Sequence, residues 1–185
     1  MKLRPLTRDD AALAVAFLDA MPDGDRTFFK EPVGLETVQR WCDEPTSSRW
    51  LLIDDEGAAV AYLAVVPGVG WSAHVGERRL IVAPSHRRRG LGTRLAREGL
   101  VAGVRAGLRK LTVEVVADKV GDIEMFSALG FDPEGLLVDH IRDRSGHLRD
   151  LVILSHQVDD VADDLARIGV DGELDVPASG PGPTR

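Results

Sequence analysis

The stretch that decides the fold is LIVAPSHRRRGLGT, residues 80–93. It begins as an apolar run, passes Pro84, and leads through three arginines, Gly90 and Gly92 into a segment of helical length. Glycines at a strand-to-helix turn let the backbone approach a ligand, and the unpaired amides at a helix start form a positive pocket. The stretch therefore predicts a phosphate site between a buried strand and a helix, and a pyrophosphate suits it best.

Three other interpretations of the same residues differ in the ligand that they imply. In the simplest, Gly90 and Gly92 only permit a tight turn and the arginines are a solvated charge run; the stretch by itself leaves this open. A dinucleotide site of the G-x-G-x-x-G type fits poorly, because position 95 is Leu and no alternating parallel pattern precedes the loop. A mononucleotide phosphate loop needs a Gly-Lys-Ser/Thr ending, which this stretch does not have.

The residues before the stretch predict helices and antiparallel strands. Leu35, Val38 and Trp41 recur at intervals of three, which is the spacing of one helical face. Two apolar runs flank the segment Asp54-Asp55-Glu56-Gly57, a composition typical of a tight hairpin connection. The elements predicted here are helices over 11–18 and 35–41 and strands over 50–53, 58–66 and 74–83.

The residues after the stretch complete a mixed α/β chain. Ala96, Gly99 and Gly103 lie along one side of the helix that the stretch begins, so we expect this helix to approach the sheet closely. Gly130 is placed to close a short helix. The predicted elements are helices over 90–107 and 122–129 and strands over 110–116, 136–141 and 151–155.

Composition narrows the class of protein. A chain of 185 residues with 44% hydrophobic residues is expected to form one compact domain. Its net charge of −7 argues against nucleic acid as a partner, because phosphate binding draws on clustered Lys and Arg. Cys42 is the single cysteine, and no Cys/His spacing indicates a metal site. With no leader and no long apolar run, the expectation is a cytoplasmic protein without a membrane partner.

A family resemblance follows from two segments in order. Val82-Ala83-Pro84 followed by Arg87-x-x-Gly90-x-Gly92 resembles the acetyl-CoA signature of the GCN5-related N-acetyltransferase (GNAT) superfamily. The later segment Phe126-Ser-Ala-Leu-Gly130-Phe131 resembles the family's aromatic-x-x-x-Gly-Phe ending. The likeness implies an α/β (α+β) fold with a mostly antiparallel central sheet, flanked by helices and splayed at the acetyl-CoA site. It also implies acetyl-CoA as cosubstrate without a metal, and homodimers are common in the family.

The resemblance also implies a set of acetyl-CoA-binding residues. Backbone amides from Arg88 to Thr93 would hold the pyrophosphate, and the backbone of Ile81 and Val82 would pair with the pantetheine arm like an added strand. One or two of the three arginine side chains would point inward to phosphates. The predicted set is Ile81, Val82, Arg87, Arg88, Arg89, Gly90, Leu91, Gly92, Thr93, Lys119 and Phe126.

The catalytic pattern departs from the family at two positions. Phe126 stands where the family often has a tyrosine that protonates the departing thiolate, and Lys119 stands where it often has an asparagine. Tyr62, the one tyrosine, lies in an earlier strand and is interpreted as a packing residue. For a general base, Glu77 matches the region where many members carry a glutamate, and His74 is the second candidate because its ordinary pKa is near 6.5.

The resulting hypothesis is an enzyme that transfers an acetyl group from acetyl-CoA to a primary amine of a small molecule or peptide, by direct attack. The alternative is a catalytically impaired acyl-CoA-binding regulatory module, and a third is a domain that retains the fold alone. The acetyltransferase domain is predicted over residues 1–157 and a helical extension over 158–170. Residues 171–185, rich in Gly, Pro, Asp and Ser, are predicted to form a flexible tail.

Overall fold

A computed structural model describes residues 1–26, 29–143 and 145–158 of the chain. Beyond Val158, the predicted helical extension and tail lie outside the described residues. A seven-stranded sheet runs through the described part in the order β1-β2-β3-β4-β5-β7-β6. Its strands are β1 (Lys2–Pro5), β2 (Ser48–Ile53), β3 (Ala59–Pro67), β4 (Val75–Val82), β5 (Lys110–Val116), β6 (Asp132–Arg142) and β7 (Leu148–Gln157).

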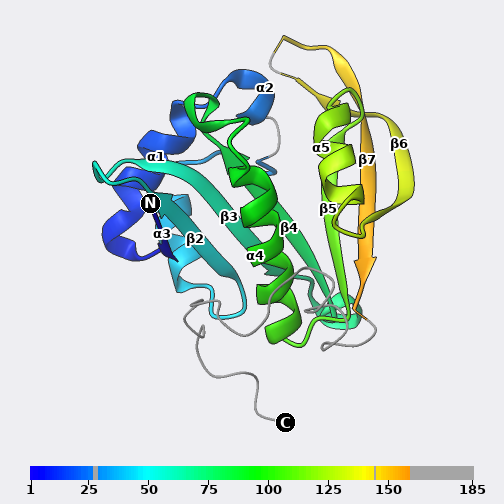
Figure 1. Cartoon of the computed structure of the whole chain (residues 1–185), viewed down its shortest axis with the longest axis horizontal. Coiled ribbons are helices and arrows are strands. Elements are labelled where there is room, and N and C mark those ends of the chain that lie inside the picture. The colour runs from blue at the N-terminus through cyan, green and yellow to red at the C-terminus, as the bar shows by residue number, and fades with distance from the viewer. Residues whose placement is uncertain (27–28, 144, 159–185) are drawn as a thin grey trace.

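Helices cover both faces of this sheet (Figure 1). The helices are α1 (Ala11–Asp19), α2 (Asp23–Arg26), α3 (Leu35–Asp43), α4 (Leu91–Arg105) and α5 (Val120–Ser127). Every strand pair is antiparallel except β4 with β5, which is parallel and is bridged by α4. The predicted fold, a mixed and mostly antiparallel sheet flanked by helices, is confirmed.

Alternation along β3 divides the core between the two faces. Tyr62 and Ala64 pack with α1 and α3, whereas Leu63 and Val65 pack with α4 on the other face. All four side chains are buried, since successive residues of a strand point to opposite faces and both faces are covered. The central strands are therefore held rigidly by packing on both sides, and they carry the site described below.

Close approach of α4 to the sheet depends on its glycines, as the spacing of small residues predicted. A Cβ atom at Gly99 would lie 2.5 Å from Cδ of Arg78, and one at Gly103 would lie 2.5 Å from Cδ2 of Leu111. Leu111 is fully buried in the core cluster beneath α4, where close packing resists its displacement. The helix can pack at this distance because these two positions have no side chain.

Gly103→Val should destabilise the protein by about 2 kcal/mol, because the added methyl groups overpack the contact with Leu111. Urea denaturation measures the change in the free energy of unfolding. Gly121→Val is the matched control, since a Cβ atom at Gly121 in α5 meets no atom within 4 Å. An unchanged unfolding midpoint for Gly103→Val would contradict the close packing of α4.

Two elements were missed from the sequence. β1 has only four residues, which is too few to show a period, yet it pairs with β2 along its whole length. α2 lies in the polar, turn-rich segment after Pro22 and consists of Asp23, Gly24, Asp25 and Arg26. None of the helices in the described ranges is long and apolar enough to cross a membrane.

Candidate active site

The centre of the site is a slot between β4 and β5. These parallel strands pair from Val75 with Lys110 up to Arg78 with Val113. Beyond that point β4 continues to Val82 and β5 to Val116 without further pairing between them. Figure 1 shows the two strands separating toward the end at which α4 begins. The backbone groups on the facing edges of both strands are thus directed into the slot, as the predicted splay requires.

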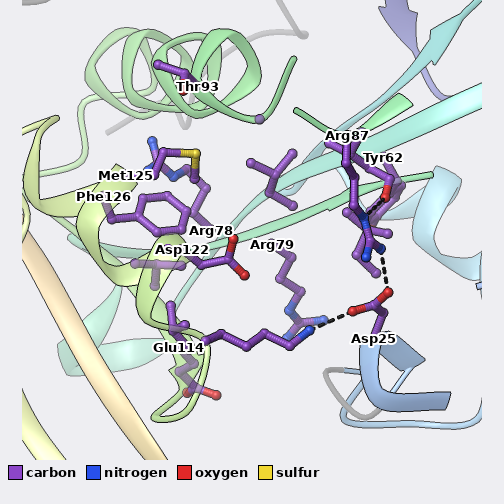
Figure 2. Close-up of a pocket in the computed structure, with 18 of the residues that line it drawn as sticks. Asp25, Tyr62, Arg78, Arg79, Arg87, Thr93, Glu114, Asp122, Met125 and Phe126 are labelled. Carbon is purple, nitrogen blue, oxygen red and sulfur yellow. Dashed lines mark hydrogen bonds and ion pairs between the residues drawn. The ribbon is translucent and has the colours of Figure 1, made fainter. Parts of the chain in front are cut away.

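A cavity of about 720 Å³ fills this slot. Its walls come from α2, β3, β4, the loop before α4 with the first turn of that helix, β5 and α5 (Figure 2). The lining includes both apolar and charged side chains. It consists of Asp25, Phe29, Tyr62, Glu77, Arg78, Arg79, Leu80, Ile81, Val82, Arg87, Arg88, Gly90, Gly92, Thr93, Val113, Glu114, Val115, Lys119, Gly121, Asp122, Glu124, Met125 and Phe126.

The loop before α4 directs backbone amides at one end of the cavity. Arg88 and Gly90 have left-handed backbone conformations, with φ of 60° and 76°. The amide of Arg94 bonds the carbonyl of Gly90 at 3.0 Å, so the amides before Arg94 precede the first intrahelical bond of α4. A Cβ atom at Gly92 would lie 3.3 Å from Sδ of Met125 in α5, so this glycine keeps the passage between α4 and α5 open.

All but two of the residues predicted to bind acetyl-CoA line the cavity. The exceptions are Arg89, which is exposed, and Leu91, whose side chain packs against the core cluster that includes Leu95. Leu91 therefore contributes to the predicted site only through its backbone at the helix start. The two side chains point elsewhere because consecutive positions in a tight turn and a first helical turn face different directions.

Asp25 connects the two sides of the cavity mouth. Its carboxylate accepts a hydrogen bond from Nζ of Lys119 at 2.6 Å and another from Nη2 of Arg87, drawn as dashed lines in Figure 2. Arg87 also donates from Nε to the carbonyl of Val82 at 2.9 Å. Burial alone would raise the pKa of Asp25, but Lys119 and Arg87 outweigh it and lower that pKa. Two of the predicted ligand-binding cations, Arg87 and Lys119, are thus paired with one acid on α2.

A second charged cluster connects β4 with β5. Nζ of Lys30 donates to Glu77 on β4 at 3.0 Å and to Glu114 on β5 at 2.8 Å, so one ammonium bridges the slot. Arg79 also donates to Glu77, at 2.9 and 3.1 Å. Burial alone would raise the pKa of Glu77, but Arg79 and Lys30 outweigh it and lower that pKa below its ordinary value. Glu77 is therefore ionised and already bonded at neutral pH.

The two candidate bases are in different places. Glu77 lines the cavity, whereas His74 is exposed in the turn before β4 and does not line it. The carbonyl of His74 accepts bonds from the amides of Arg109 and Lys110, at the start of β5 and therefore at the closed, paired end of the two strands. The slot opens toward the other end. The structure thus does not bring His74, the second predicted base, to the site.

Phe126 is buried at the wall of the slot and packs with an arginine. Its ring contacts that of Phe131 edge-on at 5.6 Å between centroids, and the guanidinium of Arg78 lies 4.9 Å from its centroid.

Tyr62 is fully buried, accepts a hydrogen bond from Arg49 at 2.8 Å and packs with Trp41, as a packing residue would. Burial raises the pKa of Tyr62.

The donor groups of the cavity fit acetyl-CoA. The amides at the start of α4, with Arg87 and Arg88 beside them, suit phosphates. The unpaired edges of β4 and β5 suit an extended arm with amide groups, which pairs as an added strand does. The side chains of Glu77 and Glu114 also line the cavity. Within the described ranges, no group of three or more His, Cys, Asp or Glu side chains is arranged to hold a metal ion.

Comparison with known proteins agrees with this geometry. The family described as "Acetyltransferase (GNAT) family" matches residues 18–131, which is more than half of the chain. Mycothiol acetyltransferase of Nocardia farcinica (strain IFM 10152) is 42% identical over 60 residues. That match covers 32% of this chain and 19% of the relative, so the chain matches about a fifth of that curated protein.

Solved structures share the fold. A ribosomal-protein-alanine N-acetyltransferase from Brucella melitensis superimposes with a TM-score of 0.72 at 19% identity, covering 85% of this chain and 99% of that one. A phosphinothricin acetyltransferase from Sinorhizobium meliloti, in complex with acetyl-CoA, has a TM-score of 0.74 at 18% identity. The superposition covers 84% of this chain and 87% of the Sinorhizobium meliloti chain. At these identities the likeness is one of fold.

Proposed function

Because the chain belongs to the acetyltransferase (GNAT) family, we propose that it transfers the acetyl group of acetyl-CoA to a primary amine of a small molecule or peptide. The observation that carries this proposal is the slot between β4 and β5, which runs from the amides of α4 to a pair of carboxylates. When bound, acetyl-CoA supplies an activated thioester. The chain supplies the groups that bind it, orient the amine and accept its proton.

The predicted residues take separate roles in this proposal. The backbone from Arg88 to Thr93 binds the pyrophosphate, and Arg87 with Arg88 adds charge-assisted contacts. Ile81 and Val82 offer the backbone edge of β4 to the extended arm. Lys119 and Phe126 form the facing wall.

Support for an amine acceptor comes from Lys30. Its ammonium already lies between Glu77 and Glu114, so the two carboxylates form a site that holds a protonated primary amine. Burial favours the neutral form, but the hydrogen bonds to Glu114 and Glu77 outweigh it and raise the pKa of Lys30. An acceptor would displace Lys30 and lose its proton before attack, because only a neutral amine is a nucleophile.

Thiol release with a panel of small amines and free-amino peptides tests this function. The purified chain with acetyl-CoA should release thiol much faster with at least one amine than without any. A binding titration with coenzyme A is run in parallel. Binding without thiol release from any amine in the panel would contradict the enzyme.

One observation favours the second candidate function, an acyl-CoA-binding regulatory module. Phe126 has no proton to donate where the family often has a tyrosine. Phe126→Tyr separates the two candidates, because a positioned acid contributes about 100-fold or more to a step limited by proton transfer. Thiol release by Phe126→Tyr alone, with an inactive wild type that binds coenzyme A, would support the module. A homodimer, a cytoplasmic location and the domain limits at residues 157 and 170 stay predictions.

A further inference from the structure

Arg78 lies where the slot closes, and the roles described above do not use it. It is the last residue of β4 that pairs with β5, opposite Val113, so the strands part directly after it. Its neighbour Arg79 points to the face that carries Glu77, and Arg78 points to the α4 face. The side chain is 1% exposed and belongs to the lining of the cavity.

The surroundings of the Arg78 guanidinium are mostly apolar. Nη1 donates to the carbonyl of Ala96 in α4, and the rings of Phe126 and Phe131 lie 4.9 and 4.5 Å from the guanidinium carbon. Figure 2 shows Arg78 beside Met125 and Phe126, next to α4. Within the described residues, Nε and Nη2 have no hydrogen-bond partner. Burial lowers the pKa of Arg78 to about 9.

Such an arrangement is costly unless a ligand completes it. A buried charged donor without a partner destabilises a fold, because it has lost water and gained nothing in exchange. The fold nevertheless makes room for this side chain, since a Cβ atom at Gly99 would lie 2.5 Å from Cδ of Arg78. The two unpaired donor nitrogens of this one guanidinium lie at the closed end of the slot, where they suit a ligand group that carries negative charge.

We propose that Arg78 stabilises the negative charge that develops on the sulfur of acetyl-CoA during transfer, in place of the tyrosine hydroxyl that Phe126 does not have. This inference rests on the proposed function. The position of Phe126 marks where the family's acid would act, and the Arg78 guanidinium packs against that ring. A charge-assisted hydrogen bond from Nε or Nη2 replaces protonation.

The step balances without a proton donor at the sulfur. The nitrogen lone pair of the amine forms the new C–N bond, and the C–S bond breaks with its electron pair going to sulfur. The sulfur leaves as a thiolate paired with the Arg78 guanidinium. The proton of the acetylated nitrogen passes to water or to Glu77, and the thiolate takes up a proton from water after it departs.

The test measures the thiol of bound coenzyme A, independently of turnover. Dissociation constants of coenzyme A and of dethio-coenzyme A, which has hydrogen in place of the thiol, are determined by calorimetry at about pH 6 and about pH 8.5. If Arg78 lowers the thiol pKa by one unit from about 8.5, the ordinary value of a cysteine thiol, the affinity for coenzyme A rises roughly fivefold relative to that for dethio-coenzyme A between these two pH values. An equal affinity ratio at both pH values in a wild type that binds coenzyme A would overturn the inference.

The comparison of two ligands cancels the titration of other groups. The titratable side chains on the elements around Arg78 include Glu98 on α4, Asp122 and Glu124 on α5, Glu114 on β5 and His156 on β7, besides Glu77 on β4, Asp150 on β7 and the lysines and arginines of these elements. Their titration changes binding of both ligands through the shared phosphates and pantetheine. The ratio of the two affinities therefore isolates the sulfur.

Variants assign the effect to the side chain. Arg78→Met should abolish the fivefold gain, Arg78→Lys should keep part of it, and Arg97→Met, on the exposed side of α4, should keep all of it. A folded Arg78→Met that retains the gain would also overturn the inference. If Arg78→Met does not fold, the wild type and Arg78→Lys decide. Failure of the wild type to bind coenzyme A at all would instead refute the proposed function, and the inference with it.

Discussion

Gly92→Glu should lower the affinity for coenzyme A by at least about 100-fold. The new carboxylate would stand in the first turn of α4, where the pyrophosphate is proposed to bind. One like-charge pair about 5 Å apart costs roughly 3 kcal/mol at an effective dielectric constant of about 20, which is about a hundredfold in affinity. Calorimetric titration with coenzyme A measures the change.

The fold of this variant should be preserved. The backbone of Gly92 is not left-handed, and the nearest atom to an added Cβ is Sδ of the flexible Met125 side chain. An acid in the first turn of a helix also interacts favourably with the helix dipole. Gly92→Gln is the matched control for size without charge and should lose less affinity. Unchanged binding by a folded Gly92→Glu would remove the basis for the phosphate site.

Glu77→Gln should lower turnover about 100-fold while leaving the affinity for coenzyme A within about twofold. The amide keeps the shape of the side chain but cannot accept a proton. An ion-paired carboxylate is a weaker base than a free one, so the effect is expected at the low end for general bases. Steady-state kinetics with an amine identified by the thiol-release panel, combined with a coenzyme A titration, separates the two quantities.

His74→Ala is the control for that experiment and should leave turnover unchanged, because His74 is exposed outside the cavity. The lowered pKa of Glu77 adds an expectation about pH. Because the pKa of Glu77 is lowered, this carboxylate stays ionised across the neutral range, so a loss of activity between pH 8 and pH 6 would report a group other than Glu77. Full activity of Glu77→Gln would exclude Glu77 as the base.

Local patterns were enough to predict most of the fold. The strand-to-helix stretch over residues 80–93 corresponds to the end of β4 and the start of α4, and the predicted strand over 110–116 matches β5. The glycine spacing in α4 correctly indicated close packing, since Gly99 and Gly103 leave no space for a side chain. These features depend on neighbours in sequence, which periodicity and turn chemistry describe.

The charged network of the site was not predictable in the same way. Asp25 bonds Lys119, 94 residues away, and Arg87, 62 residues away, and no sequence period connects such positions. Lys30 lies in the polar, turn-rich segment that follows Pro22, although its ammonium bridges two strands. Arg78 was missed because one charged residue in a strand usually faces solvent. The one available signal was the charged run Glu77-Arg78-Arg79 in a strand predicted to be buried, since alternation turns Arg78 to the opposite face from its two neighbours.

Transfer of a labelled acetyl group tests the account most directly. The chain is incubated with acetyl-CoA carrying carbon-13 in its acetyl group and with the most active amine from the panel, and the amine is then analysed by mass spectrometry. The account predicts the labelled acetyl group on the amine nitrogen, with one thiol released for each amide formed. Tight binding of acetyl-CoA with the label remaining on coenzyme A for every amine would contradict it.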